Sequence, residues 1–396
     1  MNNVRLKILY FASWYLNRYD NVLGIFVRNK AQALSSLSDV AVIYAMKDPV
    51  AQRTFDIETS FEGAIFTVRV YFRTSSNALL DALLYNFRFL QAYYRAWKMV
   101  KKQWGLPDLI HVNVVDRAGV PALLIKWLRH IPYVITEHST PDVAYTKGER
   151  AKPIFAKGWL KKLIWRYSSG GSVDSTTSLK FQEKIGISSK ICVIPNVVKV
   201  DNSKLLKSKS PNTNSNKIGF HISILIERKN VRDIIQAAAR LSSMRNDFEI
   251  HIVGTGGQKE QLLELARNLN VLDKFVFFHG YLDEEKKVEL INQSDFFILN
   301  SDEEGFSVVA AEALCYGIPV ITTDCGGPDD AEPRGSMPWF AECHRRRVRP
   351  GAVHRRVPTD GPARARRPGC SAMAACRHTP RPEPCPRSAA GVSCGR

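Results

Sequence analysis

The feature that most constrains the fold is a rhythm of short apolar runs and longer segments with helical periodicity. The rhythm occurs twice along the chain, on either side of a polar stretch. In the first half it predicts strands at 6–11, 40–44, 65–70, 109–112, 133–136, 171–172 and 192–196, and helices at 27–37 and 118–128. In the second half it predicts strands at 218–225, 249–253, 275–278, 296–299 and 319–322, and helices at 231–242, 259–269, 284–293 and 306–316. Buried apolar runs that alternate with helices indicate an α/β fold with parallel, doubly wound sheets.

The domain boundaries follow from the same rhythm. We expect an N-terminal Rossmann-like domain over residues 1–199 and a second Rossmann-like domain over residues 218–330. The stretch between them, 200–217, is rich in Ser, Asn and Lys, which is typical of a linker or an exposed loop. The two domains should face each other across a cleft.

Residues 331–396 differ in composition from everything before them. They contain 14 Arg but no Lys, and they contain no Leu, Ile, Asn or Tyr. Without Leu and Ile the segment cannot present a regular apolar face, so we expect it to be disordered. We interpret it as a foreign or out-of-frame tail joined near Asp330, which leaves the second domain incomplete; a natural basic, Pro-rich tail is the alternative. On the first interpretation the chain keeps its fold in outline but has little activity.

The net charge does not indicate nucleic-acid binding. The formal charge is +18, and the tail alone accounts for +10 of it. The remainder of the chain is therefore only mildly basic, as suits an enzyme that binds anionic substrates.

Cysteine spacing and hydropathy indicate in which cellular compartment the protein is expected. Cys192, Cys315 and Cys325 show neither metal nor disulfide spacing, and the tail contains no Cys-x-x-Cys pair, so we predict no metal site. No stretch reaches the roughly 18 apolar residues that span a bilayer, and no secretory signal is visible. We expect a cytoplasmic protein. Residues 151–167 combine basic and aromatic side chains in a predicted amphipathic helix, which either meets an anionic membrane surface or packs on its own domain.

Two carboxylates frame the predicted helix 306–316. Glu304 and Glu312 are eight residues apart, which is about 12 Å along a helix and comparable to the span of a diphosphate. The backbone amides of Gly305, Phe306 and Ser307, at the positive end of the helix dipole, would cradle the phosphates. The alternative is that both acids only stabilise the helix itself.

The block from Glu304 onward resembles the retaining GT-B glycosyltransferases of glycosyltransferase family 4, whose hallmark is a Glu-x7-Glu element. After Glu312 it continues with Gly317-Ile318-Pro319 and Gly326-Gly327, as in that family. Upstream, Gly254 and Gly256 resemble its glycine-rich turn, and Phe278-His279-Gly280 resembles its base-contacting loop. The resemblance covers about residues 6–330.

The resemblance implies roles for residues of the second domain. Glu312 would bind the nucleotide ribose, and Glu304 would hold a hydroxyl of the donor sugar. Lys229 would neutralise the leaving diphosphate. Many relatives carry an Arg at the end of the preceding strand; here that stretch reads Ser223-Ile224-Leu225, so Arg228 is the nearest candidate.

Two residues of the first domain also match the family pattern. Thr136-Glu137-His138 resembles a turn in which the histidine faces the donor sugar, and a structural histidine is the alternative. Gly24 resembles the glycine of the first loop, where a missing Cβ lets the backbone approach phosphates and acceptor. A simple turn glycine is the alternative there.

These motifs together predict a retaining hexosyltransferase. It would move a hexose from a nucleotide-diphosphate sugar to a glycan or lipid-linked acceptor in the synthesis of a cell-surface polysaccharide. No cofactor and no metal are implied, because Ser301-Asp302-Glu303 is not the Asp-x-Asp element of the other glycosyltransferase fold. A sugar-nucleotide epimerase and a non-catalytic truncated remnant are the alternatives. An oxidoreductase is disfavoured because the glycine-rich turn lacks the third glycine of the dinucleotide fingerprint.

Overall fold

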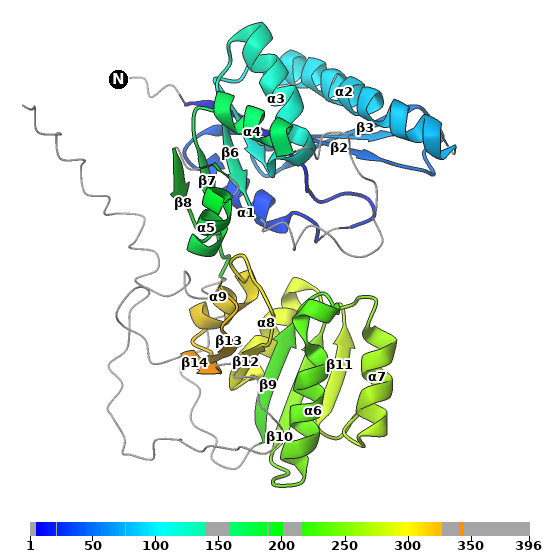
Figure 1. Cartoon of the computed structure of the whole chain (residues 1–396), viewed down its shortest axis with the longest axis vertical. Helices are drawn as coiled ribbons and strands as arrows, with labels where there is room; N and C mark the ends of the chain where they lie inside the picture. Colours follow the sequence, from blue (N-terminus) through cyan, green and yellow to red (C-terminus); the bar gives the residue numbers. More distant parts are fainter. Residues whose placement is uncertain are drawn as a thin grey trace, which may run out of the picture. The chain divides into compact units, whose positions relative to one another are not determined.

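The computed structural model describes residues 5–20, 22–75, 77–138, 158–184, 186–187, 190–200, 216–326 and 340–343. Their strands form two sheets that belong to one compact unit (Figure 1). We call the two sheets with their helices the N-terminal lobe and the C-terminal lobe.

The N-terminal lobe is a mixed sheet with helices on both faces. Its strands are β1 (Lys7–Ala12), β2 (Asp39–Lys47), β3 (Phe55–Glu62), β4 (Ile65–Phe72), β5 (Leu109–Asn113), β6 (Tyr133–Glu137), β7 (Gly171–Val173) and β8 (Ile191–Val193). Its helices are α1 (Ile25–Ser35), α2 (Ala78–Gln103), α3 (Val115–Arg129), α4 (Gly158–Tyr167) and α5 (Thr176–Lys184). The strand order is β3-β4-β2-β1-β5-β6-β7-β8, and all neighbours are parallel except β3 and β4.

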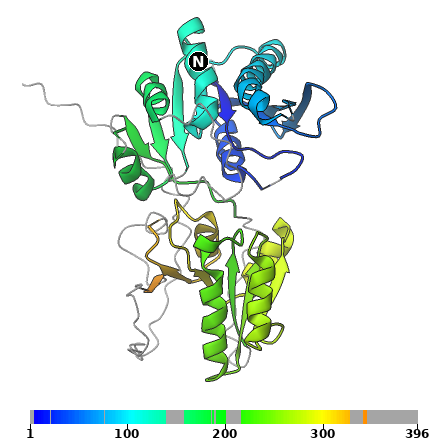
Figure 2. The same cartoon turned by 45° about the vertical axis from the view of Figure 1, so that its right-hand side comes forward.

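The C-terminal lobe is a parallel sheet. Its strands are β9 (Lys217–Ile222), β10 (Phe248–Val253), β11 (Val276–Gly280), β12 (Phe296–Leu299), β13 (Val320–Thr323) and β14 (Phe340–Cys343). Its helices are α6 (Val231–Ser242), α7 (Lys259–Asn268), α8 (Glu284–Gln293) and α9 (Val308–Cys315), preceded by the 3₁₀ turn η4 (Glu227–Lys229). The strand order is β11-β10-β9-β12-β13-β14. Figure 2 shows α6 and α7 running alongside these strands.

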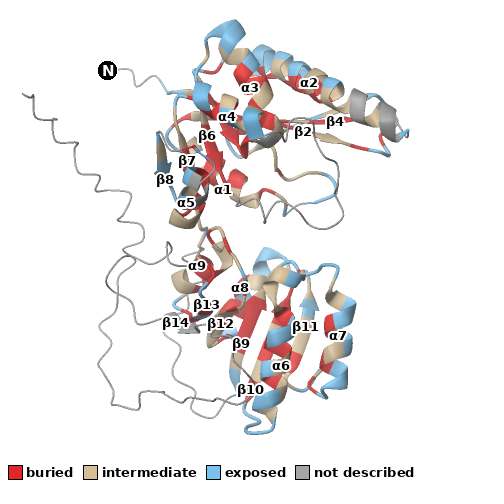
Figure 3. Ribbon diagram, viewed as in Figure 1, coloured by how far each residue is buried: buried red, intermediate tan, exposed pale blue. Residues whose placement is uncertain are grey.

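Alternate residues of each strand enter different apolar cores, because successive side chains of a strand point to opposite faces. Leu9 and Phe11 of β1 pack into the core that includes α2 and α3, whereas Ile8 and Tyr10 pack into the core beneath α1. In the C-terminal lobe the α6–α7 core and the α8–α9 core lie on opposite faces in the same way. In Figure 3 the central strands of both sheets are largely buried and the outer helix faces are exposed. Each sheet is therefore doubly wound, as predicted.

Most predicted elements are present within a few residues of their expected ends. The spans predicted for α6, α8 and β12 match the observed helices and strand. The strands β3 and β14 and the helices α2 and α5 were not predicted. β3 is half exposed and rich in polar residues, so it lacks the apolar run of a buried strand. α2 carries apolar residues over much of its first half, which obscures the helical period.

Two predicted segments fall largely outside the described residues. Of the linker 200–217, residues 201–215 are not described. Of the tail 331–396, only Phe340–Cys343 are described, and they form β14, which pairs in parallel with β13. The expectation that the tail has no structure is therefore wrong at these four residues.

Candidate active site

The C-terminal lobe places its predicted site residues where the winding of the sheet reverses. β9 lies between β10 and β12, and the chain leaves β9 in one direction and returns to β12 from the other. At such a switch point the carboxyl ends of two neighbouring strands leave a crevice, which is where ligands of open α/β sheets bind. Lys229 follows β9 and Glu304 follows β12, so both side chains arise at this crevice.

Lys229 and Glu304 form an ion pair. The Nζ atom of Lys229 contacts Oε1 of Glu304, and the hydroxyl of Ser301 donates to the same oxygen at 2.6 Å. Both charged side chains are almost completely buried, with 13% and 11% exposure. The loop itself is fixed by the amide of Glu304, which donates to the carbonyl of Cys325 at 2.9 Å. The two residues that were predicted to hold the sugar and the diphosphate are thus in direct contact.

The helix between the two carboxylates is shorter than predicted. α9 begins at Val308, and Ser307 precedes it with φ 55° in the left-handed region. Gly305 and Phe306 therefore lie in a non-helical turn, so a uniform helical rise from Glu304 to Glu312 was wrong. The amides that lead into α9 are nevertheless at its positive end, and the Ser307 side chain makes no capping hydrogen bond with them. These backbone amides at the start of α9 therefore remain available to bind an anion.

Glu312 is held by a lysine that the sequence analysis missed. Nζ of Lys287, on α8, lies 3.1 Å from Oε1 and 3.0 Å from Oε2 of Glu312, and 3.0 Å from the carboxylate of Glu284. Burial raises the pKa of the Glu312 carboxyl, while Lys287 opposes the rise. The two neighbouring carboxylates hold the pKa of Lys287 above its ordinary value, although burial alone would lower it. No motif marks Lys287, since its partner is 25 residues away.

The glycine-rich turn follows β10 beside β9. Gly254 has φ 136°, and a Cβ at this position would lie 1.8 Å from the carbonyl oxygen of Ser223. A Cβ at Gly256 would meet the carbonyl oxygen of Leu225 at 2.4 Å. The turn therefore packs directly against the segment that leads into η4 and Lys229, and only glycine permits this approach.

The remaining predicted residues of this lobe have distinct surroundings. Arg228 lies in η4, and its carbonyl accepts from the amide of Asp302 at 2.9 Å; among the ion pairs of the described chain none involves its guanidinium. His279, in the predicted base-contacting loop, lies at the end of β11, where its Nε2 is 2.7 Å from Nδ1 of His251. The two imidazole rings stack with centroids 5.0 Å apart.

In the N-terminal lobe, Gly24 ends the loop after β1 and precedes α1. Its φ is 72°, and a Cβ there would lie 2.4 Å from the carbonyl oxygen of Trp14. The loop folds back on itself at this point, which any larger residue would prevent.

The three residues of the Thr136-Glu137-His138 turn have three different environments. The Thr136 hydroxyl bridges Nε2 of His111 at 2.7 Å and the Ser172 hydroxyl at 2.8 Å, across neighbouring strands. The Glu137 carboxylate accepts from the amide of Val115 at 3.2 Å and so stabilises the start of α3. Of the three residues, only His138 lies beyond the carboxyl end of β6.

His138 is surrounded by polar groups from neighbouring strand ends, none of which was predicted. Its Nε2 lies 3.4 Å from Oδ1 of Asn113, and its Nδ1 lies 4.0 Å from Oδ2 of Asp174. Asn196 donates to the same Asp174 oxygen at 3.3 Å. Burial lowers the pKa of His138 well below its ordinary value, and Lys30 adds to the effect. Asn113, Asp174 and Asn196 are each a polar residue at the end of a predicted strand or within two residues of it, which was the available signal for this set.

The Glu304 loop approaches this group. A Cβ built on Gly305 would lie 3.4 Å from Oδ2 of Asp174 and 3.4 Å from the carbonyl oxygen of His138. Lys229 and Glu304 from one sheet and His138 from the other are therefore candidate residues of one site.

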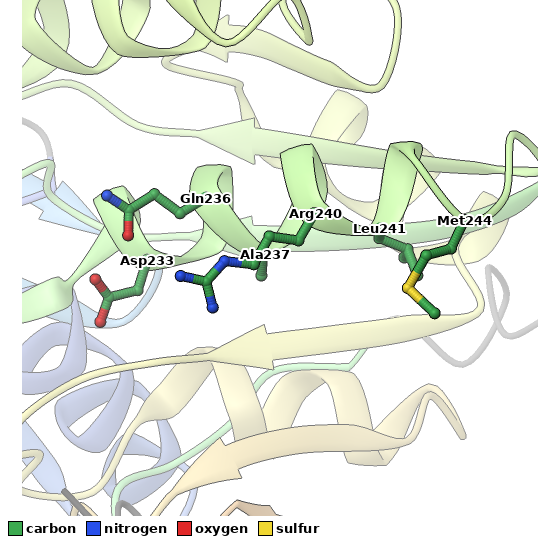
Figure 4. A pocket seen from close by; sticks show the side chains of 6 residues that line it. All are labelled: Asp233, Gln236, Ala237, Arg240, Leu241 and Met244. Carbon is green, nitrogen blue, oxygen red and sulfur yellow. The ribbon is translucent and has the colours of Figure 1, made fainter. Parts of the chain in front are cut away.

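Two other features were tested as site candidates. A shallow hollow along α6 is lined by Asp233, Gln236, Ala237, Arg240, Leu241 and Met244 (Figure 4), and it contains none of the predicted site residues. Among the side chains that the structure describes, no group of three or more His, Cys, Asp or Glu is arranged to hold a metal ion.

Known proteins match the chain over both lobes. The family model Glycosyltransferase Family 4 matches residues 23–202, and the model Glycosyl transferases group 1 matches residues 183–340. N-acetyl-alpha-D-glucosaminyl L-malate synthase of Bacillus anthracis is 31% identical over 137 residues, which are 35% of this chain and 35% of that protein, about a third of its length. The putative teichuronic acid biosynthesis glycosyltransferase TuaC of Bacillus subtilis is 24% identical over 344 residues, 81% of this chain and 82% of the relative.

Solved structures show the same fold. The Anabaena protein HepE in complex with UDP and glucose superposes with a TM-score of 0.56 at 16% identity, covering 85% of this chain and 86% of HepE. The fold, the two family models and the relatives agree with one another. The chain belongs to the glycosyltransferases with the GT-B fold.

Proposed function

We propose that this protein transfers a hexose from a nucleotide-diphosphate sugar to a glycan or lipid-linked acceptor, with retention of the anomeric configuration. Among its relatives, TuaC is named for teichuronic acid biosynthesis, and the HepE structure contains UDP and glucose. These names support a surface polymer as the product and a nucleotide sugar as the donor.

The ion pair between Lys229 and Glu304 is the observation that carries the proposal. Two buried charges of opposite sign lie beside a helix start that its own serine does not cap. A diphosphate that enters here gains the lysine and the backbone amides, and Glu304 is then free to accept hydrogen bonds from sugar hydroxyls. At the other end of α9, Lys287 holds the Glu312 carboxylate for the ribose.

The chemistry needs charge stabilisation more than proton transfer. Breaking the bond between the sugar and the diphosphate leaves an oxocarbenium-like carbon and a diphosphate anion. Lys229, with Arg228 as a second cation, stabilises the departing anion. This stabilisation requires no metal ion and no cofactor. Delivery of the acceptor hydroxyl from the face that the diphosphate leaves gives retention.

An anionic membrane surface is proposed as a partner on the N-terminal lobe. Trp127 and Leu128 of α3 are exposed at 47% and 75%, and the Trp127 ring contacts Tyr167 of α4 edge to face at 5.5 Å. Both helices also carry basic residues in their last turns, namely Lys126 and Arg129 of α3 and Arg166 of α4. Ile164 and Trp165 of α4 are buried, so only part of the predicted amphipathic helix is available for a membrane; residues 151–157 lie outside the described chain. No helix among those described has both the length and the apolar character to cross a bilayer.

Incubation with a panel of UDP-, GDP- and ADP-sugars tests the proposal. The correct donor should raise the melting temperature, because a ligand that binds only the native state stabilises it. Donor with a mixture of glycan acceptors should then give a glycosylated product of unchanged anomeric configuration. An epimerised sugar formed from the donor alone would identify an epimerase instead. Binding of no nucleotide sugar would contradict both.

A further inference from the structure

The N-terminal lobe contains two buried charged residues that the proposed reaction does not yet use. Asp174 follows β7 and Lys30 lies on α1, and the two residues are 2% and 8% exposed. Burial of charged groups is costly, so such groups persist where they have a partner and a task.

Asp174 is fixed on both of its carboxylate oxygens. The Ser178 hydroxyl donates to Oδ1 at 2.8 Å, and the Asn196 side chain donates to Oδ2 at 3.3 Å. Oδ2 also lies 4.0 Å from Nδ1 of His138. The carboxylate therefore has one orientation, and in that orientation it faces the imidazole.

Lys30 is fixed in the same region. Its Nζ donates to the carbonyl oxygen of Ile194 at 3.1 Å, two residues before Asn196. One turn earlier on the same face of α1, the Phe26 ring packs against the His138 imidazole with centroids 4.5 Å apart. α1 thus contributes both a wall for the imidazole and a positive charge for Asp174.

We propose that Asp174 and Lys30 are positioning residues for His138 in hexosyl transfer. The Asp174 carboxylate faces the Nδ1 side of the imidazole at 4.0 Å, and Lys30 supplies a positive charge that favours the ionised form of this carboxylate. His138 then faces the donor sugar as a neutral ring in one orientation. The inference has two parts. The structural part, that Asp174 and Lys30 orient the His138 ring, rests on the N-terminal lobe alone. The catalytic part, that this orientation matters for hexosyl transfer, rests on the proposed function.

The surrounding charges agree with this assignment. The charged or titratable groups around the imidazole are Asp174 after β7, Lys30 on α1, His111 on β5, and Cys192 on β8 beside Lys30. Burial lowers the pKa of His111 to about 3, so His111 adds no positive charge at neutral pH. Burial and the charge of Lys30 then favour the neutral imidazole, and the Asp174 carboxylate lies on its Nδ1 side.

The test combines kinetics with a readout that does not depend on transfer. Nitrogen NMR of histidine-labelled protein should show His138 neutral and in a single tautomer between pH 8 and pH 5. In Asp174→Asn the tautomer populations should change, and in Lys30→Met the His138 pKa should rise because the carboxylate is no longer balanced. Unchanged His138 signals in both variants would overturn the structural part.

Kinetics test the catalytic part. Asp174→Asn should lower kcat about 10- to 100-fold, as expected when the group that orients a catalytic residue is removed. The KM for the donor should change little, and Asp174→Glu should recover part of the rate. Wild-type kcat in Asp174→Asn would overturn this part. If the wild-type protein transfers no sugar, the proposed function fails, while the NMR experiment still decides whether Asp174 and Lys30 orient the ring. If Asp174→Asn does not fold, Lys30→Met supplies both measurements.

Discussion

Lys287 binds both carboxylate oxygens of Glu312, at 3.1 and 3.0 Å, from the neighbouring helix α8. Burial and the nearby Glu284 raise the pKa of Glu312, and Lys287 opposes that rise and holds the carboxylate in place. The ribose-binding role proposed for Glu312 therefore depends on a residue outside every motif.

The first prediction concerns this pair. Lys287→Met should weaken the binding of the cognate nucleotide about tenfold or more, since a charge-assisted hydrogen bond contributes about 1.5–3 kcal/mol. Isothermal titration of the nucleotide measures the change. Lys286→Met, on the adjacent exposed position of α8, is the control and should bind as the wild type does. Equal affinities of both variants would show that Lys287 does not orient Glu312.

Glu304→Gln should lower kcat about 100-fold, within the range seen when one group that stabilises the transition state is lost. Lys229 would retain its position but lose the carboxylate that it contacts. Product formation under donor saturation measures the effect, and Glu303→Gln provides the matched control one residue away. A rate for Glu304→Gln close to that of the control would show that Glu304 takes no part in catalysis.

Gly254→Ala should destabilise the C-terminal lobe by about 2 kcal/mol, because a methyl group would collide with the Ser223 carbonyl at a positive φ. Gly257→Ala is the control, since a Cβ at Gly257 meets nothing within 4 Å. Urea unfolding measures both. If the two alanine variants unfold at the same midpoint, the close approach at Gly254 is not required.

Lys30 makes stability depend on pH. Burial lowers the pKa of Lys30 from 10.5 to about 8. Between these two values the unfolded chain binds more protons than the native protein, so the contribution of Lys30 to stability rises with pH. The stability of the wild type relative to Lys30→Met should therefore increase from pH 8 to pH 10, by up to about 1.4 kcal/mol per pH unit. Urea midpoints across this range measure the difference, and a constant difference would contradict the prediction.

Membrane binding should depend on the exposed surface of α3. The double variant Trp127→Ser with Leu128→Ser should co-sediment several-fold less with vesicles that contain anionic lipid, because apolar insertion and basic attraction act together there. Met244→Ser removes an apolar side chain that is 82% exposed in the turn after α6, and it should leave binding unchanged. Equal sedimentation with neutral and anionic vesicles would contradict the membrane proposal.

The sequence predicted the two sheets well because their strands are buried on both faces and read as continuous apolar runs. β3 was not predicted because an edge strand with one exposed face carries polar residues, as its sequence FDIETSFE does. Local motifs made Glu304, Glu312, Lys229 and His138 candidate site residues because these residues lie within or beside recognisable turns.

The residues around them were not predictable in the same way. Lys287, Asp174 and Lys30 are brought to the site by packing between elements distant in the chain, and pairings of that kind leave no local pattern. The predicted start of α9 was wrong because Ser307 adopts a left-handed conformation, which its residue type does not indicate.

The contact between Lys229 and Glu304 has a consequence for the order of events in the proposed reaction. Before the donor arrives, the lysine already has a counter-charge, so an incoming diphosphate must exchange with Glu304 instead of filling a vacant cationic position. A nucleotide that still bears its sugar supplies hydroxyls to the released carboxylate; a spent nucleotide leaves that buried carboxylate with the Ser301 hydroxyl but without a counter-charge. The lysine and the acid therefore recombine most readily after the sugar has gone, which favours expulsion of the product and resets the enzyme for the next cycle.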